Sequence, residues 1–223
     1  MKLNFVIFFV VLTLLWWLFM KNCMFIGNMG CGKSTWLKAL NQHGYRTIFE
    51  DLSDIVYLKD YWEKGTFAFH TQVSFYASWL NLYNKANQMG GALLDSSILS
   101  HHMVFTQHMF DDGTLDRNEY NLCCQLFNAI YNNIDCQCIY LHCDVDENIK
   151  RVSNRSRNLE KRNVDYVIEM NKRFEILAYA QRNHMLSINI TALSPHSYED
   201  FIYFCNQLIE GGINIDCYLR GNR

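Results

Sequence analysis

The sequence predicts an α/β fold in which a parallel five-stranded sheet is flanked by helices. Five short apolar or β-branched runs are typical of buried strands, and segments with helical periodicity separate them. Strands that alternate with helices form parallel sheets covered on both faces. Half of the 223 residues are hydrophobic and 15% are aromatic, so the chain can build a core and is not disordered.

The expected elements follow one another along a single domain of residues 23–223, in which no repeat or linker marks a boundary. The expected strands are residues 23–26, 45–49, 92–94, 136–141 and 186–190. The expected helices are residues 33–42, 71–88, 98–110, 115–132, 145–155, 164–182 and 197–209. Ser194-Pro195 is typical of a helix start, with the serine as cap and the proline in the first turn.

The first 22 residues form a segment of a different kind. Residues 3–20 are almost wholly apolar, and roughly 18 residues at about 1.5 Å each make a helix of about 27 Å, close to the thickness of a bilayer core. Trp16-Trp17 lies near the end of this run, where interfacial aromatic residues are expected. We therefore expect a membrane anchor that leaves the domain at the cytoplasmic face. The alternative is a cytoplasmic protein whose translation starts at Met20.

Charge and cysteine content exclude some classes of function. A net charge of −2 provides no electrostatic attraction for a nucleic acid. The nine cysteines do not have the spacing of a structural zinc site, and we expect reduced thiols in an intracellular compartment.

The strongest motif directly follows the first strand. It matches the phosphate-binding loop G-x-x-x-x-G-K-[ST], and a helix follows it, as that motif requires. Its backbone amides surround phosphate oxygens, its lysine reaches the β and γ phosphates, and its serine hydroxyl binds Mg²⁺. The sequence thus predicts binding of ATP with Mg²⁺. The expected ATP-binding residues are Gly27, Asn28, Met29, Gly30, Cys31, Gly32, Lys33, Ser34 and Thr35.

Two acidic residues follow the second and third strands, where ligands of parallel sheets bind. Glu50 could accept a proton from an attacking hydroxyl, and Asp95 could hold Mg²⁺. Each acid could also be a simple helix cap at a strand end.

A cluster of arginines follows the fourth strand. Arg151 and Arg155 lie four residues apart on one helix face, and Arg157 comes just beyond. In a phosphate-loop protein such a cluster indicates a lid that closes over the transferring phosphoryl group and spreads its charge. The alternative is a set of cations that complements a helix C-terminus.

These motifs together resemble the deoxynucleoside kinase family. The likeness runs from about residue 22 to about residue 189 and has an ordered set of segments. These are F-I-G-N-M-G-C-G-K-S-T, the acid after the second strand, the long helix with Thr71-Gln72, L-L-D-S-S-I-L-S-H-H-M-V-F, E-Y-N-L-C-C-Q-L-F, R-V-S-N-R-S-R-N-L-E-K and D-Y-V-I-E-M-N-K-R-F-E.

The resemblance implies a role for individual residues. Glu50 is similar to the family's general base for the sugar 5′-hydroxyl, and Gln72 to the glutamine that binds the nucleobase edge. Tyr61 and Glu160 resemble the pair that holds the sugar 3′-hydroxyl, and Asp95 the acid associated with Mg²⁺. The three lid arginines match as well, and the family implies a homodimer.

The chain departs from the family at two positions. Ser96 occupies the position where the family has an arginine that contacts the catalytic acid, and the loss of such a contact can cost on the order of 10²–10³ in rate. His101 occupies a position, expected to bind substrate, where base-specific members commonly have aspartate. Because histidine can donate or accept, the preferred base does not carry over.

Aromatic residues near the expected acceptor site include candidate stacking partners for a base. We expect one or two of them to touch a ligand and the rest to be core. The candidates are Trp62, Phe67, Phe69, Phe75 and Trp79.

The sequence therefore predicts a kinase that transfers the γ-phosphate of ATP to the 5′-hydroxyl of a deoxynucleoside, in the salvage of DNA precursors. One alternative is a kinase of a different small acceptor. Another is a degenerate, membrane-tethered nucleotide-binding relative in which Ser96 has removed the chemistry. The acceptor residues Glu50, Gln72 and Glu160 favour the active kinase.

Overall fold

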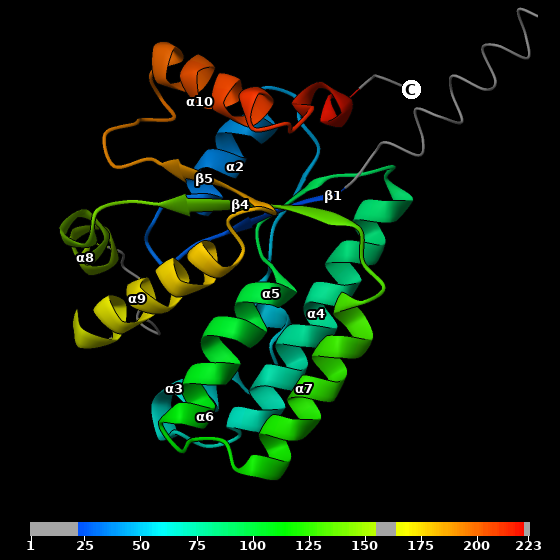
Figure 1. Cartoon of the computed structure of the whole chain (residues 1–223), viewed down its shortest axis with the longest axis vertical. Coiled ribbons are helices and arrows are strands. Elements are labelled where there is room, and N and C mark those ends of the chain that lie inside the picture. The colour runs from blue at the N-terminus through cyan, green and yellow to red at the C-terminus, as the bar shows by residue number, and fades with distance from the viewer. Residues whose placement is uncertain (1–21, 155–163, 221–223) are drawn as a thin grey trace, which may run out of the picture.

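The computed structural model describes residues 22–154 and 164–220, and these form the expected α/β arrangement around one sheet (Figure 1). The five strands are all parallel and lie in the order β2-β3-β1-β4-β5. Their bounds are β1 Asn22–Ile26, β2 Thr47–Ile48, β3 Leu93–Leu94, β4 Cys136–His142 and β5 Met185–Asn189. The prediction of a five-stranded parallel sheet flanked by helices is confirmed.

The strand β1 lies at the centre of the sheet because its apolar sequence can be buried on both faces. All five of its residues are buried, and it pairs with β3 on one side and β4 on the other. The strand β2 is shorter than the sequence predicted. Tyr45 pairs instead with Leu219 in an isolated antiparallel bridge, and the backbone of Arg46 donates to the carbonyl oxygen of Tyr218.

The helices of the described residues include every helical segment predicted from sequence; the α-helix α3 and two short 3-10 helices, Leu52–Asp54 and Ile215–Tyr218, were not predicted. Their bounds are α2 Lys33–Gln42, α3 Leu58–Lys64, α4 Ala68–Gln88, α5 Ile98–Ser100, α6 Gln107–Asp111, α7 Arg117–Tyr131, α8 Val145–Ser153, α9 Val164–Ala180 and α10 Tyr198–Glu210. The run predicted as one helix over residues 98–110 is continuous, but its middle, His101–Thr106, is a π-helix. Such wide turns are rare and often mark functional sites.

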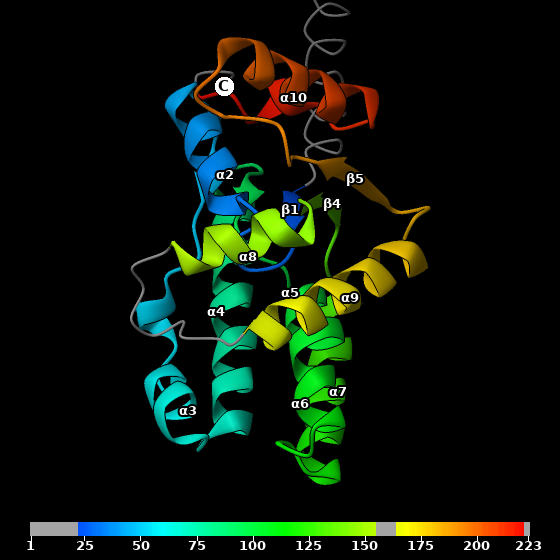
Figure 2. The same cartoon turned by 90° about the vertical axis from the view of Figure 1, so that its left-hand side faces the viewer.

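The helices cover the two faces of the sheet as separate layers. In Figure 1, α2 and α10 lie above the sheet, and α4, α5, α7 and α9 lie below it; Figure 2 shows the same division from the side. Trp36 of α2 stacks on Phe204 of α10 at 4.2 Å in the upper core. Trp79 of α4 and Phe174 of α9 are fully buried in the lower core.

The start of the last helix differs from the prediction. The cap is Ser197, whose side chain accepts a hydrogen bond from the backbone of Asp200, so α10 begins at Tyr198. The expectation that Ser194 caps this helix was wrong. Its backbone donates to the carboxylate of Asp200 instead, which fixes the chain that leads into the helix.

The predicted membrane anchor of residues 1–22 lies, but for Asn22, outside the described residues. Among the helices of the described residues, none has both the length and the hydropathy that crossing a bilayer requires.

Candidate active site

A cavity of about 540 Å³ opens at the carboxyl ends of β1, β2 and β3. The residues directly after these three strands line it, as expected for a parallel sheet. Its volume lies in the range of small-molecule sites. Of the predicted site residues, those that line the cavity are Gly27, Met29, Gly30, Gly32, Lys33, Ser34, Glu50, Tyr61, Gln72, Asp95 and His101.

The phosphate-binding loop between β1 and α2 needs glycine at its closest approaches. A Cβ atom at Gly27 would overlap the carbonyl oxygen of Leu141 in β4. Gly30 has a φ of 79°, and a Cβ there would lie 2.5 Å from a methyl group of Val152 in α8. The loop therefore packs against β4 and α8 as closely as backbone alone allows.

Lys33 begins α2 and turns its ammonium group back over the loop. Its Nζ donates to the carbonyl oxygens of Gly27 at 2.6 Å and Asn28 at 3.0 Å. The positive charge thus lies at the mouth of the loop and beside the N-terminus of α2, where an anion is favoured.

Three buried asparagines join this loop to the two helices that flank the predicted lid. Asn28 shares its side-chain amide hydrogens among the side-chain oxygens of Asn148 in α8 and Asn171 in α9, both at 2.9 Å, and the carbonyl oxygen of Val167. Asn148 in turn donates to the carbonyl oxygen of Met29 at 2.6 Å. Because buried amides are costly when unpaired, this network fixes the loop relative to α8 and α9.

Glu50 forms a compact cluster with the two residues that depart from the family pattern. Its Oε1 accepts hydrogen bonds from Ser96 Oγ at 2.9 Å and from His101 Nε2 at 3.0 Å, and these two donors lie 2.7 Å apart. Burial raises the pKa of Glu50, but His101, Ser96 and Lys33 together outweigh it and hold that pKa below its usual value. Glu50 is therefore an ionised carboxylate at neutral pH.

Gln72 lies at the end of a buried chain of hydrogen bonds. Thr106 Oγ1 lies 3.1 Å from Gln72 Oε1 and 2.9 Å from the carbonyl oxygen of His101, and both of these atoms can only accept. The Thr106 hydroxyl therefore donates to one of them, and it must accept from Tyr76 Oη at 2.7 Å. Tyr76 Oη accepts in turn from His102 Nδ1 at 2.7 Å. When Thr106 donates to Gln72, this chain orients the oxygen of the Gln72 amide.

Arg151 lies beside the phosphate-binding loop. Its Nη1 donates to the carbonyl oxygen of Cys31 at 3.1 Å, and its Nε pairs with Glu147 at 2.8 Å. The other predicted lid residues Arg155 and Arg157, and the predicted sugar ligand Glu160, lie outside the described residues. The lid thus stays a prediction.

The aromatic candidates lie in different surroundings. Trp62 and Phe75 line the cavity, whereas Trp79 is fully buried and donates from its indole to the carbonyl oxygen of Ser96 at 3.1 Å. Phe67 is 47% exposed and has a φ of 62°, and Phe69 packs between the lower core and a small cluster that contains Ala68, Met109 and Leu115.

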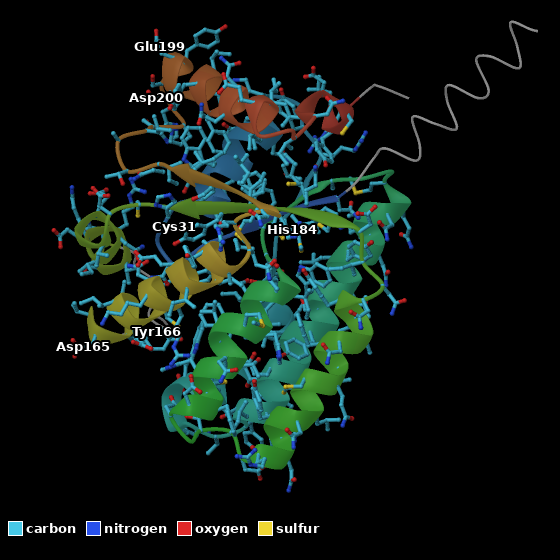
Figure 3. All side chains as sticks on the ribbon, in the orientation of Figure 1. Cys31, Asp165, Tyr166, His184, Glu199 and Asp200 are labelled. Carbon is cyan, nitrogen blue, oxygen red and sulfur yellow. The ribbon has the colours of Figure 1, made fainter. Side chains whose placement is uncertain are left out.

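Sequence reasoning missed several residues that line the cavity, among them Phe105, Met109 and Tyr166. Phe105 and Met109 follow His101 at intervals of four, so the shared helical face was a usable signal. Tyr166, near the start of α9 (Figure 3), carried no such signal because its approach to the cavity depends on where α9 packs.

Among the described residues, no cluster of three or more histidine, cysteine, aspartate or glutamate side chains could hold a metal ion. A Mg²⁺ ion bound mainly by substrate phosphates needs fewer protein ligands than that. The hydroxyl of Ser34 and the carboxylate of Asp95 both line the cavity and are oxygen donors of the kind Mg²⁺ prefers.

Known proteins resemble this chain in sequence. The family model described as deoxynucleoside kinase matches residues 25–210. A deoxyadenosine kinase of Dictyostelium discoideum is 29% identical over 140 residues, which cover 60% of this chain but only 57% of that protein. A Fowlpox virus (strain NVSL) protein named "Probable deoxycytidine kinase" is 25% identical over 194 residues, with 82% of this chain and 81% of the relative covered.

Solved structures with similar folds include the deoxyadenosine kinase of M. mycoides. Its complex with dATP has a TM-score of 0.69 at 20% identity and covers 85% of this chain and 99% of the other. Its complex with dCMP and dCDP has a TM-score of 0.71 at 20% identity, with the same coverage. At this identity the likeness supports the fold.

The chain is thus an enzyme of the phosphate-loop kinase class. More particularly, it belongs to the deoxynucleoside kinase family, whose model covers most of its length. The resemblance inferred from the sequence motifs is confirmed, and with it the prediction that the chain is an enzyme of the deoxynucleoside kinase family.

Proposed function

We propose that the protein transfers the γ-phosphate of ATP to the 5′-hydroxyl of a deoxynucleoside and releases a deoxynucleoside monophosphate and ADP. One observation carries this proposal: the ammonium group of Lys33, the carboxylate of Glu50 and the amide of Gln72 line one cavity. A phosphate-binding group, a base and a hydrogen-bonding side chain for a nucleobase are thus within reach of one substrate.

The chemistry follows from the placement of the phosphate-binding loop, Glu50 and the expected Mg²⁺ ligands. The backbone of the phosphate-binding loop and Lys33 bind the triphosphate and offset its charge. Glu50 accepts the proton of the 5′-hydroxyl as the new oxygen–phosphorus bond forms and the bond to the bridging oxygen of ADP breaks. Ser34 and Asp95 would hold Mg²⁺, which would neutralise charge on the phosphates.

The acceptor side of the cavity suits a nucleoside. Gln72 offers both a donor and an acceptor to a base edge, and Phe75 and Trp62 provide aromatic faces. Tyr61 lines the cavity and is proposed to hold the sugar 3′-hydroxyl together with Glu160. Arg151, Arg155 and Arg157 are proposed to close over the phosphoryl group and stabilise its charge.

An acceptor that already carries a phosphate is disfavoured. Such a substrate needs additional cations at the acceptor end of the site. Among the described lining residues the lysines are Lys33 and Lys38, and both lie in α2 beside the phosphate-binding loop.

Two further properties remain proposals. A homodimer follows from membership of the family, and sedimentation of the purified protein tests it. Anchoring of the domain at a cytoplasmic membrane face through residues 1–22 is tested by cell fractionation of the full chain against a chain that begins at Met20.

The proposed reaction is tested with the full-length protein, Mg-ATP and each of the four deoxynucleosides. We expect formation of a monophosphate from at least one of them, and a Glu50→Gln variant that still binds ATP but turns over at least about 10²-fold more slowly. Glu199→Gln is the matched control, because Glu199 is exposed on α10 (Figure 3). ATP binding without turnover on any deoxynucleoside would contradict the proposal and favour the degenerate nucleotide-binding relative.

A further inference from the structure

We infer that His101 is a positioning residue for Glu50: its imidazole provides a second donor to the carboxylate oxygen that Ser96 already contacts, and the two side chains together take the place of the family's arginine. This inference rests on the proposed function and assigns His101 a role in the chemical step. The sequence had indicated a role for it in binding the base.

The direction of the hydrogen bonds in the cluster follows from their partners. Glu50 Oε1 can only accept, so the single hydrogen of the Ser96 hydroxyl is directed at it over 2.9 Å. His101 Nε2 lies 3.0 Å from the same oxygen and 2.7 Å from Ser96 Oγ, and must therefore carry a hydrogen. Both donors end on Oε1, which leaves Oε2 to accept the proton of a substrate.

The imidazole is itself held in place from several sides. Phe75 stacks on it with ring centroids 4.8 Å apart, and the His101 backbone donates to the carbonyl oxygen of Ser97 at 3.0 Å. Thr106 lies 2.9 Å from the His101 carbonyl oxygen, across the wide turn of the π-helix. The side chain of His101 is only 7% exposed, so its orientation is set by the fold.

The carboxylate depends on this contact because it is buried. The side chain of Glu50 is 16% exposed, and its interaction with His101 is the largest effect that opposes the rise of its pKa on burial. A buried carboxylate that loses its partner shifts in position or protonation. Either change lowers the rate of proton transfer without touching the groups proposed to bind the base.

The test separates kcat from KM in the full-length protein. His101→Phe keeps a ring that can stack on Phe75 but removes the donor, and we expect kcat to fall roughly 10²-fold while KM for each deoxynucleoside changes less than about threefold. His101→Gln keeps an N–H donor at a similar reach and should stay within about tenfold of the wild-type kcat. His184→Gln is the matched control, because His184 is an exposed histidine directly before the first residue of β5 (Figure 3).

A second variant tests the inference independently, in case His101→Phe does not fold. Ser96→Ala removes the other donor to Oε1 with little change of volume, and the double variant with His101→Phe should be non-additive, because both wild-type side chains act on one oxygen.

A wild-type enzyme that does not turn over would remove the proposed function and this inference together. If instead the wild type is active and a folded His101→Phe keeps its kcat within threefold, the inference alone is wrong. A changed base preference at unchanged kcat would likewise contradict the inference and would indicate that His101 binds the nucleobase, as the sequence analysis expected.

Discussion

Lowering the pH should destabilise this protein through His102, which lies in the lower core at the start of the hydrogen-bond chain to Gln72. His102 is 6% exposed and stacks on Phe127 at 4.2 Å. Burial lowers its pKa to about 4, whereas an unfolded chain has a histidine pKa of about 6.5. Below pH 6.5 the imidazole is therefore protonated in the unfolded state, whereas in the folded state it stays neutral until the pH approaches 4.

The magnitude follows from linkage. Since the folded pKa is depressed, the contribution is fully present above pH 6.5 and is lost as the pH falls toward 4. With these two pKa values, the free energy of unfolding falls by about 1.4 kcal/mol between pH 7.5 and pH 5.5. The limit over the whole window of about 2.5 pKa units is about 3.4 kcal/mol, since one pKa unit corresponds to about 1.4 kcal/mol.

The assay is urea unfolding of the wild type and of His102→Asn at both pH values. Asparagine keeps an N–H donor for Tyr76 but cannot take up a proton, so the variant should lose about 1.4 kcal/mol less than the wild type over this interval. The exposed His184→Asn should lose as much as the wild type. Equal losses in the wild type and in His102→Asn would refute the reasoning.

Two further substitutions have matched controls within the chain. Gly30→Ala should abolish ATP binding, measured by calorimetry, because the new methyl group would lie 2.5 Å from Val152. The control is Gly65→Ala: Gly65 has a similar φ, 68°, but open space around it, so this variant should still bind ATP. Thr106→Val should raise KM for the deoxynucleoside roughly tenfold, since a lost hydrogen bond of about 1–1.5 kcal/mol releases the Gln72 amide. The control Thr71→Val, which removes a buried hydroxyl without a partner among the described residues, should leave KM unchanged and not destabilise the fold. Normal ATP binding by Gly30→Ala, or an unchanged KM for Thr106→Val, would contradict these assignments.

The sequence allowed the sheet and most helices to be predicted because both depend on local pattern. Apolar runs and helical periodicity are properties of neighbouring residues, and the phosphate-binding loop is a contiguous motif. The shortening of β2 could not be predicted, because Tyr45 finds its partner Leu219 at the far end of the chain. The cap of α10 was misplaced because Ser194 and Ser197 are both acceptable caps, and only the position of Asp200 decides between them.

The candidate site shows even more clearly that contacts made by the fold cannot be predicted from local sequence pattern. Ser96 and His101 appeared in the sequence as two separate departures from the family, one weakening catalysis and the other obscuring the base preference. In the structure they are parts of one cluster, since both donate to the same oxygen of Glu50 and lie 2.7 Å apart. A loss at one position is thus offset by a side chain five residues later, brought back by the turn that begins the π-helix. A substitution at a catalytic position therefore does not by itself indicate a degenerate enzyme: the charge or donor it removes must first be sought among the residues that the fold places within about 3 Å of the same atom.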